Sequence, residues 1–183
     1  MPSTLRHALM AIFFTLFMIC TAHAAETSTG FYFDSPDGAH KLALGARYHG
    51  EATSVTQRPL QQGDLSWMLA YEYHEEIAFW QIALGYAPKS QTDKEARVLT
   101  PEINLIFKDG IYRLGVGGLM SHVSAEKSEW TDLHWQAIMG ISIPLGPRIS
   151  VDLYGYYLFH KWDEIAKGSD NALEASLFLA LQF

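Results

Sequence analysis

The 183-residue sequence predicts an all-β fold in which eight antiparallel strands run up and down and close into a barrel. Three observations predict it. Apolar and polar residues alternate with a period of two, which is the period of a β-strand. The alternating stretches have similar lengths, and the connections between them are short and long in turn.

The composition excludes several other classes of protein. Hydrophobic residues make up 49% of the chain, yet the mean hydropathy is +0.00 because polar residues are interleaved with them. Lys and Arg number 13 against 20 Asp and Glu, and the basic residues form no cluster, so no nucleic-acid partner is expected. After residue 24, no apolar run approaches the roughly 18 residues of a membrane-spanning helix.

The N-terminal segment is expected to be a cleaved signal peptide. Arg6 precedes an uncharged apolar run from Ala8 to Cys20, and the small-x-small sequence Ala22-His23-Ala24 follows it. Cleavage after Ala24 leaves a chain without cysteine, which excludes disulfides and thiol catalysis. The expected organisation is a signal peptide at 1–24, a periplasmic lead segment at 25–39 and a barrel at 40–183.

The strands are identified by alternation, most clearly at the C-terminus. Leucine and alanine occupy the odd positions up to Phe183, whereas Glu174 and Ser176 occupy even positions. Each alternating stretch is close to the roughly 9–11 residues with which a tilted strand crosses a bilayer. The expected strands are 40–53, 65–74, 77–87, 98–108, 111–121, 133–145, 149–160 and 172–183.

The connections divide into two classes. Asp109-Gly110 and Gly146-Pro147 favour chain reversal, as expected for tight turns. Long and short connections alternate, as they must when every hairpin has one end on each side of a membrane. The tight turns are expected at 74–77, 108–110 and 145–148, and the longer polar connections at 54–64, 88–97, 122–132 and 161–171.

The apolar face of the barrel is expected to contact lipid. Alternation alone does not distinguish this orientation from a soluble barrel with an apolar interior. However, eight strands enclose a narrow space, which the many aromatic rings of this face would overfill. Rings near strand ends are typical of the aromatic girdles of membrane barrels. The expected girdle residues are Tyr48, Trp67, Trp80, Tyr112, Trp135, Tyr157, Phe159 and Phe183.

The opposite, polar face predicts an ion-pair network inside the barrel. Arginine beside several carboxylates forms charge-assisted hydrogen bonds, and an unpaired charge would cost several kcal/mol. We expect the network to plug the lumen, because open aqueous channels belong to barrels of about 16 strands or more. The expected members are Arg47, Glu72, Glu102, Arg113 and Asp152.

The sequence resembles the small outer-membrane β-barrel proteins of Gram-negative bacteria, which include OmpA-type, OmpX-type and PagL-type barrels. The resemblance rests on eight strands, alternating connections and the ending Leu179-Ala180-Leu181-Gln182-Phe183. It implies a monomeric barrel in the outer membrane, with short periplasmic turns, longer extracellular loops, and lipid and lipopolysaccharide around it. It also implies that the outer-membrane assembly machinery recognises the last strand through Phe183. The subfamily stays open.

Two polar residues near the long connections are candidates for catalysis. His160 and Glu174 are expected on adjacent strands, and a His held by a carboxylate is the base half of a Ser-His-acid hydrolase. The pair resembles that of PagL-type lipid A deacylases. Those enzymes carry a Ser two residues after the His, where this sequence has Trp162, and strand parity directs Glu174 into the lumen. No compact histidine spacing indicates a metal, and no cofactor is expected.

Three functions are therefore considered. The first is a structural or surface-interaction protein that acts through its loops and has a plugged lumen. The alternative is a lipid A or phospholipid hydrolase of the PagL type that uses His160 and Glu174. The third is a narrow path for small molecules.

Overall fold

The computed structural model describes residues 38–53, 59–88, 96–125, 128–162 and 171–183. The expected signal peptide and the lead segment up to residue 37 lie outside these residues. The last two residues of the lead segment are described, and they pair with the end of the second strand. Gly38 N donates to His74 O at 2.8 Å, and His74 N donates to Ala39 O at 2.9 Å.

Eight long strands form the wall of a barrel, and their bounds lie within two residues of those expected from the sequence. The strands are β1 (His40–Thr53), β2 (Leu65–His74), β3 (Ala78–Ala87), β4 (Arg97–Asp109), β5 (Tyr112–Leu119), β8 (His134–Pro144), β9 (Ile149–Phe159) and β10 (Asn171–Gln182).

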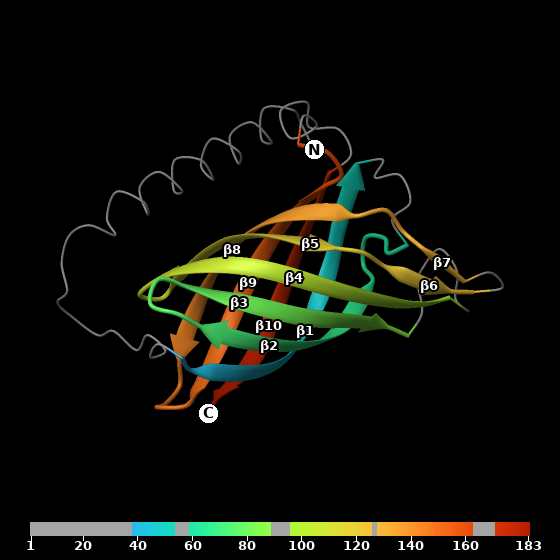
Figure 1. The fold of residues 1–183 in the computed structure, drawn as a ribbon. Coiled ribbons are helices and arrows are strands. Elements are labelled where there is room, and N and C mark those ends of the chain that lie inside the picture. The colour runs from blue at the N-terminus through green and yellow to red at the C-terminus, as the bar shows by residue number, and fades with distance from the viewer. Residues whose placement is uncertain (1–37, 54–58, 89–95, 126–127, 163–170) are drawn as a thin grey trace. The chain divides into compact units, whose positions relative to one another are not determined.

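Each of these strands pairs antiparallel with the next along the chain (Figure 1). The first and last strands, β1 and β10, also pair, from Lys41 opposite Gln182 to Thr53 opposite Asn171, and this closes the barrel. The prediction of an eight-stranded, antiparallel, up-and-down barrel is confirmed. In the described part of the chain, no helix is long and apolar enough to cross a membrane.

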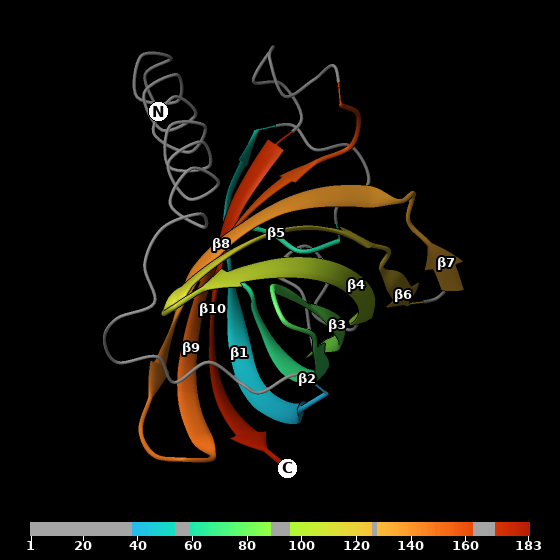
Figure 2. The ribbon, with the colours of Figure 1, turned by 60° about the vertical axis from the view of Figure 1, so that its left-hand side comes forward.

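A short hairpin extends the wall on one side. It consists of β6 (His122–Ser124) and β7 (Ser128–Trp130), and β6 pairs with the end of β4 that extends past β5. In Figures 1 and 2 this hairpin projects beyond the other strands. From the sequence, residues 122–132 are expected to form a longer polar connection. The structure differs because backbone pairing with β4, rather than side-chain alternation, forms the hairpin.

The barrel has tight turns at one end and longer connections at the other, as the sequence predicted. The end that we call the turn end carries the tight turns β2–β3, β4–β5 and β8–β9. In the first, Glu75 N donates to Ala78 O at 2.8 Å. In the second, Gly110 has φ 54°, a backbone conformation that glycine adopts without steric cost. The opposite end, which carries β6, β7 and the longer connections, is the loop end.

Side chains alternate between the two faces of the wall over most of each long strand. In β2, every second residue is buried and the residues between them are exposed. The exposed set is apolar and includes Leu44, Trp67, Ile82 and Leu179, whereas the lumen contains most of the buried charged and amide side chains. The outer surface of the barrel is therefore apolar, as the aromatic content of the sequence predicted. The interior combines these polar side chains with a buried apolar cluster that includes Phe79, Ile106, Ile138 and Phe178.

Candidate functional site in the barrel lumen

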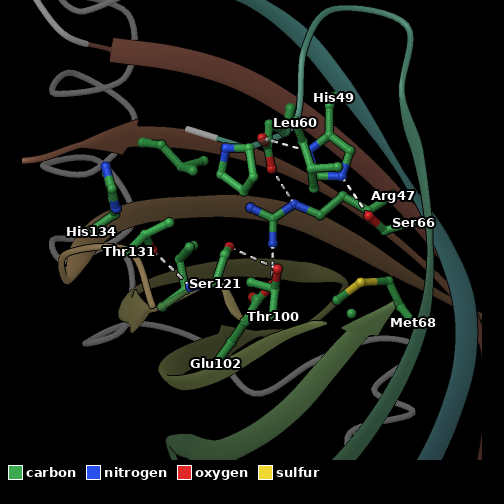
Figure 3. A pocket seen from close by; sticks show the side chains of 15 residues that line it. Arg47, His49, Leu60, Ser66, Met68, Thr100, Glu102, Ser121, Thr131 and His134 are labelled. Carbon is green, nitrogen blue, oxygen red and sulfur yellow. Dashed lines mark hydrogen bonds and ion pairs between the residues drawn. The ribbon is translucent and has the colours of Figure 1, made fainter. Parts of the chain in front are cut away.

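Arg47 on β1 is the centre of the polar interior, and 2% of it is exposed. Its Nη1 lies 2.5 Å from Glu102 Oε1 on β4 (Figure 3). Its Nη2 donates to Gln136 Oε1 on β8 at 2.9 Å. Its Nε forms an ion pair with Glu174 Oε2 on β10. The ring of Tyr156 on β9 lies 3.9 Å from the guanidinium carbon, at cation–π distance. One side chain therefore joins five strands across the lumen.

Amide side chains extend this arrangement toward the turn end. Gln136 Nε2 donates to Glu102 Oε2 at 2.9 Å and to Asn104 Oδ1 at 2.7 Å. Asn104 Nδ2 donates to Gln81 Oε1 at 2.9 Å. Because a buried amide without partners would be destabilising, these bonds fix which side chains occupy the middle of the lumen.

A carboxylate and a histidine continue the chain of contacts. Gln81 Nε2 donates to Glu72 Oε1 at 2.9 Å, and Glu72 Oε2 lies 2.9 Å from His74 Nε2. The His74 ring is fully buried and stacks on Phe79 with 4.4 Å between ring centroids. The contacts thus run without interruption from Arg47 to the last residue of β2.

Arg113 and Asp152 have other described partners near the turn end. Arg113 Nη1 donates to the carbonyl oxygens of Gly110 at 2.6 Å and Tyr112 at 2.8 Å. Asp152 accepts a hydrogen bond from the Ser142 hydroxyl. Arg113 therefore holds the β4–β5 turn, and Asp152 links the two strands that form the β8–β9 hairpin.

Of the five residues predicted as an ion-pair network, Arg47 and Glu102 are paired directly, and Glu72 is joined to them through neutral amides. Those amides and His49 are network members beyond the five predicted from the sequence. In the sequence, these residues are marked only by being polar at positions whose side chains face the lumen. We call the connected set the lumen network; it comprises Ser66, His49, Glu174, Arg47, Glu102, Gln136, Asn104, Gln81, Glu72 and His74.

The loop end of the network is built on three adjacent strands, β10, β1 and β2. His49 Nδ1 lies 2.8 Å from Glu174 Oε1, and His49 Nε2 lies 2.7 Å from Ser66 Oγ. All three residues are buried. His49 and Glu174 are register partners on β1 and β10, so the pairing of the first and last strands brings them together.

His160 is not the partner of Glu174, which differs from the expectation from the sequence. The register places Tyr156 opposite Glu174, and His160 lies four residues further along, about 13 Å at the rise of a strand. The His160 ring instead packs against that of His134, with 5.4 Å between centroids. Both oxygens of Glu174 are engaged by Arg47 and His49.

A small cavity lies beside this end of the network. Its volume is about 20 Å³, which is room for about one water molecule. In the described part of the chain, no group of three or more His, Cys, Asp and Glu side chains is arranged to hold a metal ion. The residues that line the cavity are Arg47, His49, Pro59, Leu60, Ser66, Met68, Gly85, Thr100, Glu102, Leu119, Ser121, Thr131, His134, Leu158 and Glu174.

The eight residues expected in the aromatic girdle differ in how far their rings are exposed. Six of the eight expected girdle residues are exposed: Tyr48, Trp67, Trp80, Tyr112, Trp135 and Phe183. Tyr157 is half-buried. Phe159 is only 2% exposed, because Trp162 from the following connection packs edge-on against it with 4.9 Å between centroids. At the turn end, His40 stacks on Phe183 at 6.0 Å and contacts the Tyr71 hydroxyl at 2.6 Å.

Comparison with solved structures shows which known proteins share this fold. No protein-family model and no curated protein matches the sequence. Among solved structures, the N-terminal β-barrel domain of Pseudomonas aeruginosa OprF is similar, with 7% identity and a TM-score of 0.56 over 80% of this chain and 98% of that one. The chain has the fold of the small eight-stranded outer-membrane β-barrels.

Two further structures support the same assignment. Neisserial surface protein A has 13% identity and a TM-score of 0.53, over 82% of this chain and all of that one. A chain from a de novo design of transmembrane β-barrels has 8% identity and a TM-score of 0.50, with the same coverage. At these identities, the likeness extends to the fold alone.

Proposed function

We propose that the protein is a monomeric outer-membrane barrel with a closed lumen, which serves as a scaffold for the hairpin and loops at its loop end. The observation that carries this proposal is the contact of Arg47 with Glu102 across the lumen, beside a cavity that holds about one water molecule. The apolar outer surface and the shared fold support an outer-membrane location, reached through cleavage of residues 1–24.

Conductance of planar bilayers tests the closed lumen. Folded wild-type protein is expected to add no conductance to a protein-free bilayer, because charge-assisted bonds fill the section of the lumen around Arg47. Heat-dependent gel mobility of the same sample establishes that the barrel is folded. Steady conductance that changes on Glu102→Gln substitution would support the narrow path for small molecules and contradict the closed lumen.

We further propose that lipopolysaccharide is the lipid in contact with the hairpin. A mainly apolar groove on the outer face of the wall is lined by Pro101, Ile103, Gly118, Leu119, Met120, Trp130 and Leu133, together with Glu102, whose carboxylate is paired with Arg47 in the lumen. Arg97 is exposed on the same strand as Pro101, close to the hairpin, since it pairs with Ser124 of β6. Acyl chains suit the groove, and a cation beside it suits the phosphates of the same lipid.

Retention of purified lipopolysaccharide by the folded barrel in detergent tests this assignment. Trp130→Ala and Arg97→Ser are each expected to reduce the retained lipid several-fold. Arg148→Ser is the matched control, because Arg148 is also exposed but lies in the β8–β9 turn at the opposite end. Equal loss with Arg148→Ser would show that charge alone retains the lipid and would contradict a site at the hairpin.

The described geometry does not favour the PagL-type hydrolase that uses His160 and Glu174. Glu174 is engaged by Arg47 and His49, and the residue two positions after His160 is Trp162.

A further inference from the structure

Ser66, His49 and Glu174 are arranged in the order of a nucleophile, a base and an acid. Ser66 Oγ lies 2.7 Å from His49 Nε2, and His49 Nδ1 lies 2.8 Å from Glu174 Oε1. Both distances are within the roughly 2.6–3.2 Å over which such groups transfer and orient protons. This constellation is recognised by geometry and occurs on unrelated folds and in different chain orders.

The surroundings of Glu174 fix the direction of these hydrogen bonds. Its second carboxylate oxygen is ion-paired with Arg47 Nε, and Arg47 is held in turn by Glu102 and Gln136. A carboxylate has no proton to donate, so His49 Nδ1 carries the hydrogen of the bond to Glu174. The other ring nitrogen, Nε2, is then an acceptor and receives the hydroxyl hydrogen of Ser66.

Other serines in the described lumen have different partners. Ser176 Oγ lies 2.9 Å from the Tyr156 hydroxyl, and Ser142 donates to the carboxylate of Asp152. A phenol or a lone carboxylate does not provide an imidazole base that an acid holds in place. Ser66 and Ser176 are both register partners of Arg47, on β2 and β10 respectively, which makes Ser176 a close structural match without the histidine.

We propose that Ser66, His49 and Glu174 form a nucleophilic site that hydrolyses small acyl esters entering from the loop end. The three residues line the loop-end cavity together with the apolar side chains of Leu60, Met68, Leu119 and Leu158 and the hydroxyl groups of Thr100, Ser121 and Thr131. The apolar side suits an acyl methyl group. Thr131 donates its hydroxyl hydrogen to Asp132 O, whereas the hydroxyl groups of Thr100 and Ser121 lie 2.9 Å apart, and one of these two hydrogens is left to donate to a carbonyl oxygen. The cavity volume of about 20 Å³ is room for about one water molecule, so only the carbonyl end of a formyl or acetyl ester enters it, and the alcohol part of the ester stays toward the loop end.

The reaction proceeds in two balanced steps. In the first, Ser66 Oγ bonds to the carbonyl carbon and passes its proton to His49 Nε2, the ester C–O bond breaks, and the alcohol leaves with that proton. In the second, water gives a proton to His49 Nε2 and adds to the acyl carbon, the bond to Ser66 Oγ breaks, and the serine recovers the proton. Glu174 stabilises the imidazolium that forms in each step. Water is the only co-reactant.

Two reagents test the site in the full-length folded barrel in detergent. Methanesulfonyl fluoride, a serine reagent that carries a single methyl group, is expected to form one adduct, located on Ser66 by peptide mass spectrometry, with release of fluoride and a proton. The acetyl ester p-nitrophenyl acetate is expected to be hydrolysed faster than in buffer. His49→Gln and Glu174→Gln should each lower the rate of adduct formation by about 100-fold, the lower end of the effect of a positioned base. Ser66→Ala should abolish it.

The controls separate chemistry from folding. Ser176→Ala removes the matched serine and is expected to react like wild type. Heat-dependent gel mobility shows which variants fold, and if Glu174→Gln does not fold, Ser66→Ala and His49→Gln decide the outcome. The proposal is overturned if neither reagent reacts at Ser66 in the folded wild type, or if His49→Gln reacts as fast as wild type. Bilayer conductance is measured separately, so either result leaves the closed lumen to its own test.

Discussion

Arg47 and Glu102 form an ion pair across the barrel, with 2.5 Å between Nη1 and Oε1, although β2 and β3 lie between their strands in the wall. Each side chain is only 2% exposed. Because both charges have left water, the favourable part of their interaction mainly offsets the free energy of desolvation. The pair therefore selects one arrangement of the interior more than it adds net stability.

Removal of Arg47 should destabilise the barrel strongly. Arg47→Ala leaves the buried carboxylates of Glu102 and Glu174 without their cation, and breaking a buried pair in this way costs about 3–5 kcal/mol. Urea unfolding in lipid vesicles, followed by heat-dependent gel mobility, measures the loss. Arg97→Ala is the control, since Arg97 is exposed and a surface change of this kind stays within about 0.5 kcal/mol. Equal effects of the two substitutions would contradict the role of the pair.

A methyl group at Gly117 should disturb the middle of the lumen network. A Cβ there would lie 1.8 Å from Asn104 Oδ1 and 2.7 Å from the backbone oxygen of Ile103. Asn104 must then leave its bonds with Gln81 and Gln136. Overpacking of this kind costs about 1–3 kcal/mol, so Gly117→Ala should lower the free energy of unfolding by that amount.

The control for this substitution is Gly155→Ala on β9. The nearest atom to a Cβ at Gly155 is Met139 Cγ at 3.8 Å, an ordinary van der Waals distance. The same urea experiment should give a stability close to that of wild type. If the two alanine variants were equally stable, the close packing around Asn104 would not be a constraint on the fold.

The strands of the wall are predictable from the sequence, because each strand has one face toward the lumen and the other toward the outside of the barrel. In β2 the expected range 65–74 coincides with the observed strand, since the alternation between lumen and lipid continues over its whole length. The hairpin β6–β7 is not predictable in this way. Ser128–Trp130 is exposed at every position, so it has no alternation, and its pairing depends on the overhanging end of β4.

Contacts within the lumen are less predictable than the wall. Strand parity places Arg47, Glu102 and Glu174 inside, but which of them meet depends on the tilt and stagger of the strands. His49 rather than His160 contacts Glu174, because the register of β10 places His49 opposite Glu174 on β1 and Tyr156 opposite it on β9. Strand parity also does not predict the exposure of Phe159, because Trp162 from the following connection packs against this ring and buries it.

The orientation of the barrel in lipid has a direct test at Ile82. This residue is 59% exposed near the middle of β3. An arginine at the bilayer midplane of a barrel costs about 2–4 kcal/mol, falling to about 0–1 kcal/mol near the interfaces. Ile82→Arg should therefore be much less stable than Ile149→Arg, which lies at the start of β9 beside a turn and is 45% exposed. Equal stabilities in lipid vesicles would mean that this face meets water.

The last residue should affect assembly in cells more than intrinsic folding. Phe183 N donates to His40 O at 2.9 Å, so its backbone completes the seam between β10 and β1, whereas its ring is 67% exposed. Phe183→Ala keeps the backbone bond and removes only the ring and its stacking on His40. Refolding from urea into detergent is therefore expected to be close to wild type. If the assembly machinery recognises the ring, the amount of heat-modifiable protein in the outer membrane should fall several-fold.

Tyr112→Ala, which removes an exposed aromatic ring at the same end, controls for the loss of lipid contact and should assemble normally. Equal loss of assembly in the two variants would assign the effect of Phe183 to the lipid interface and would remove the support for recognition by the machinery.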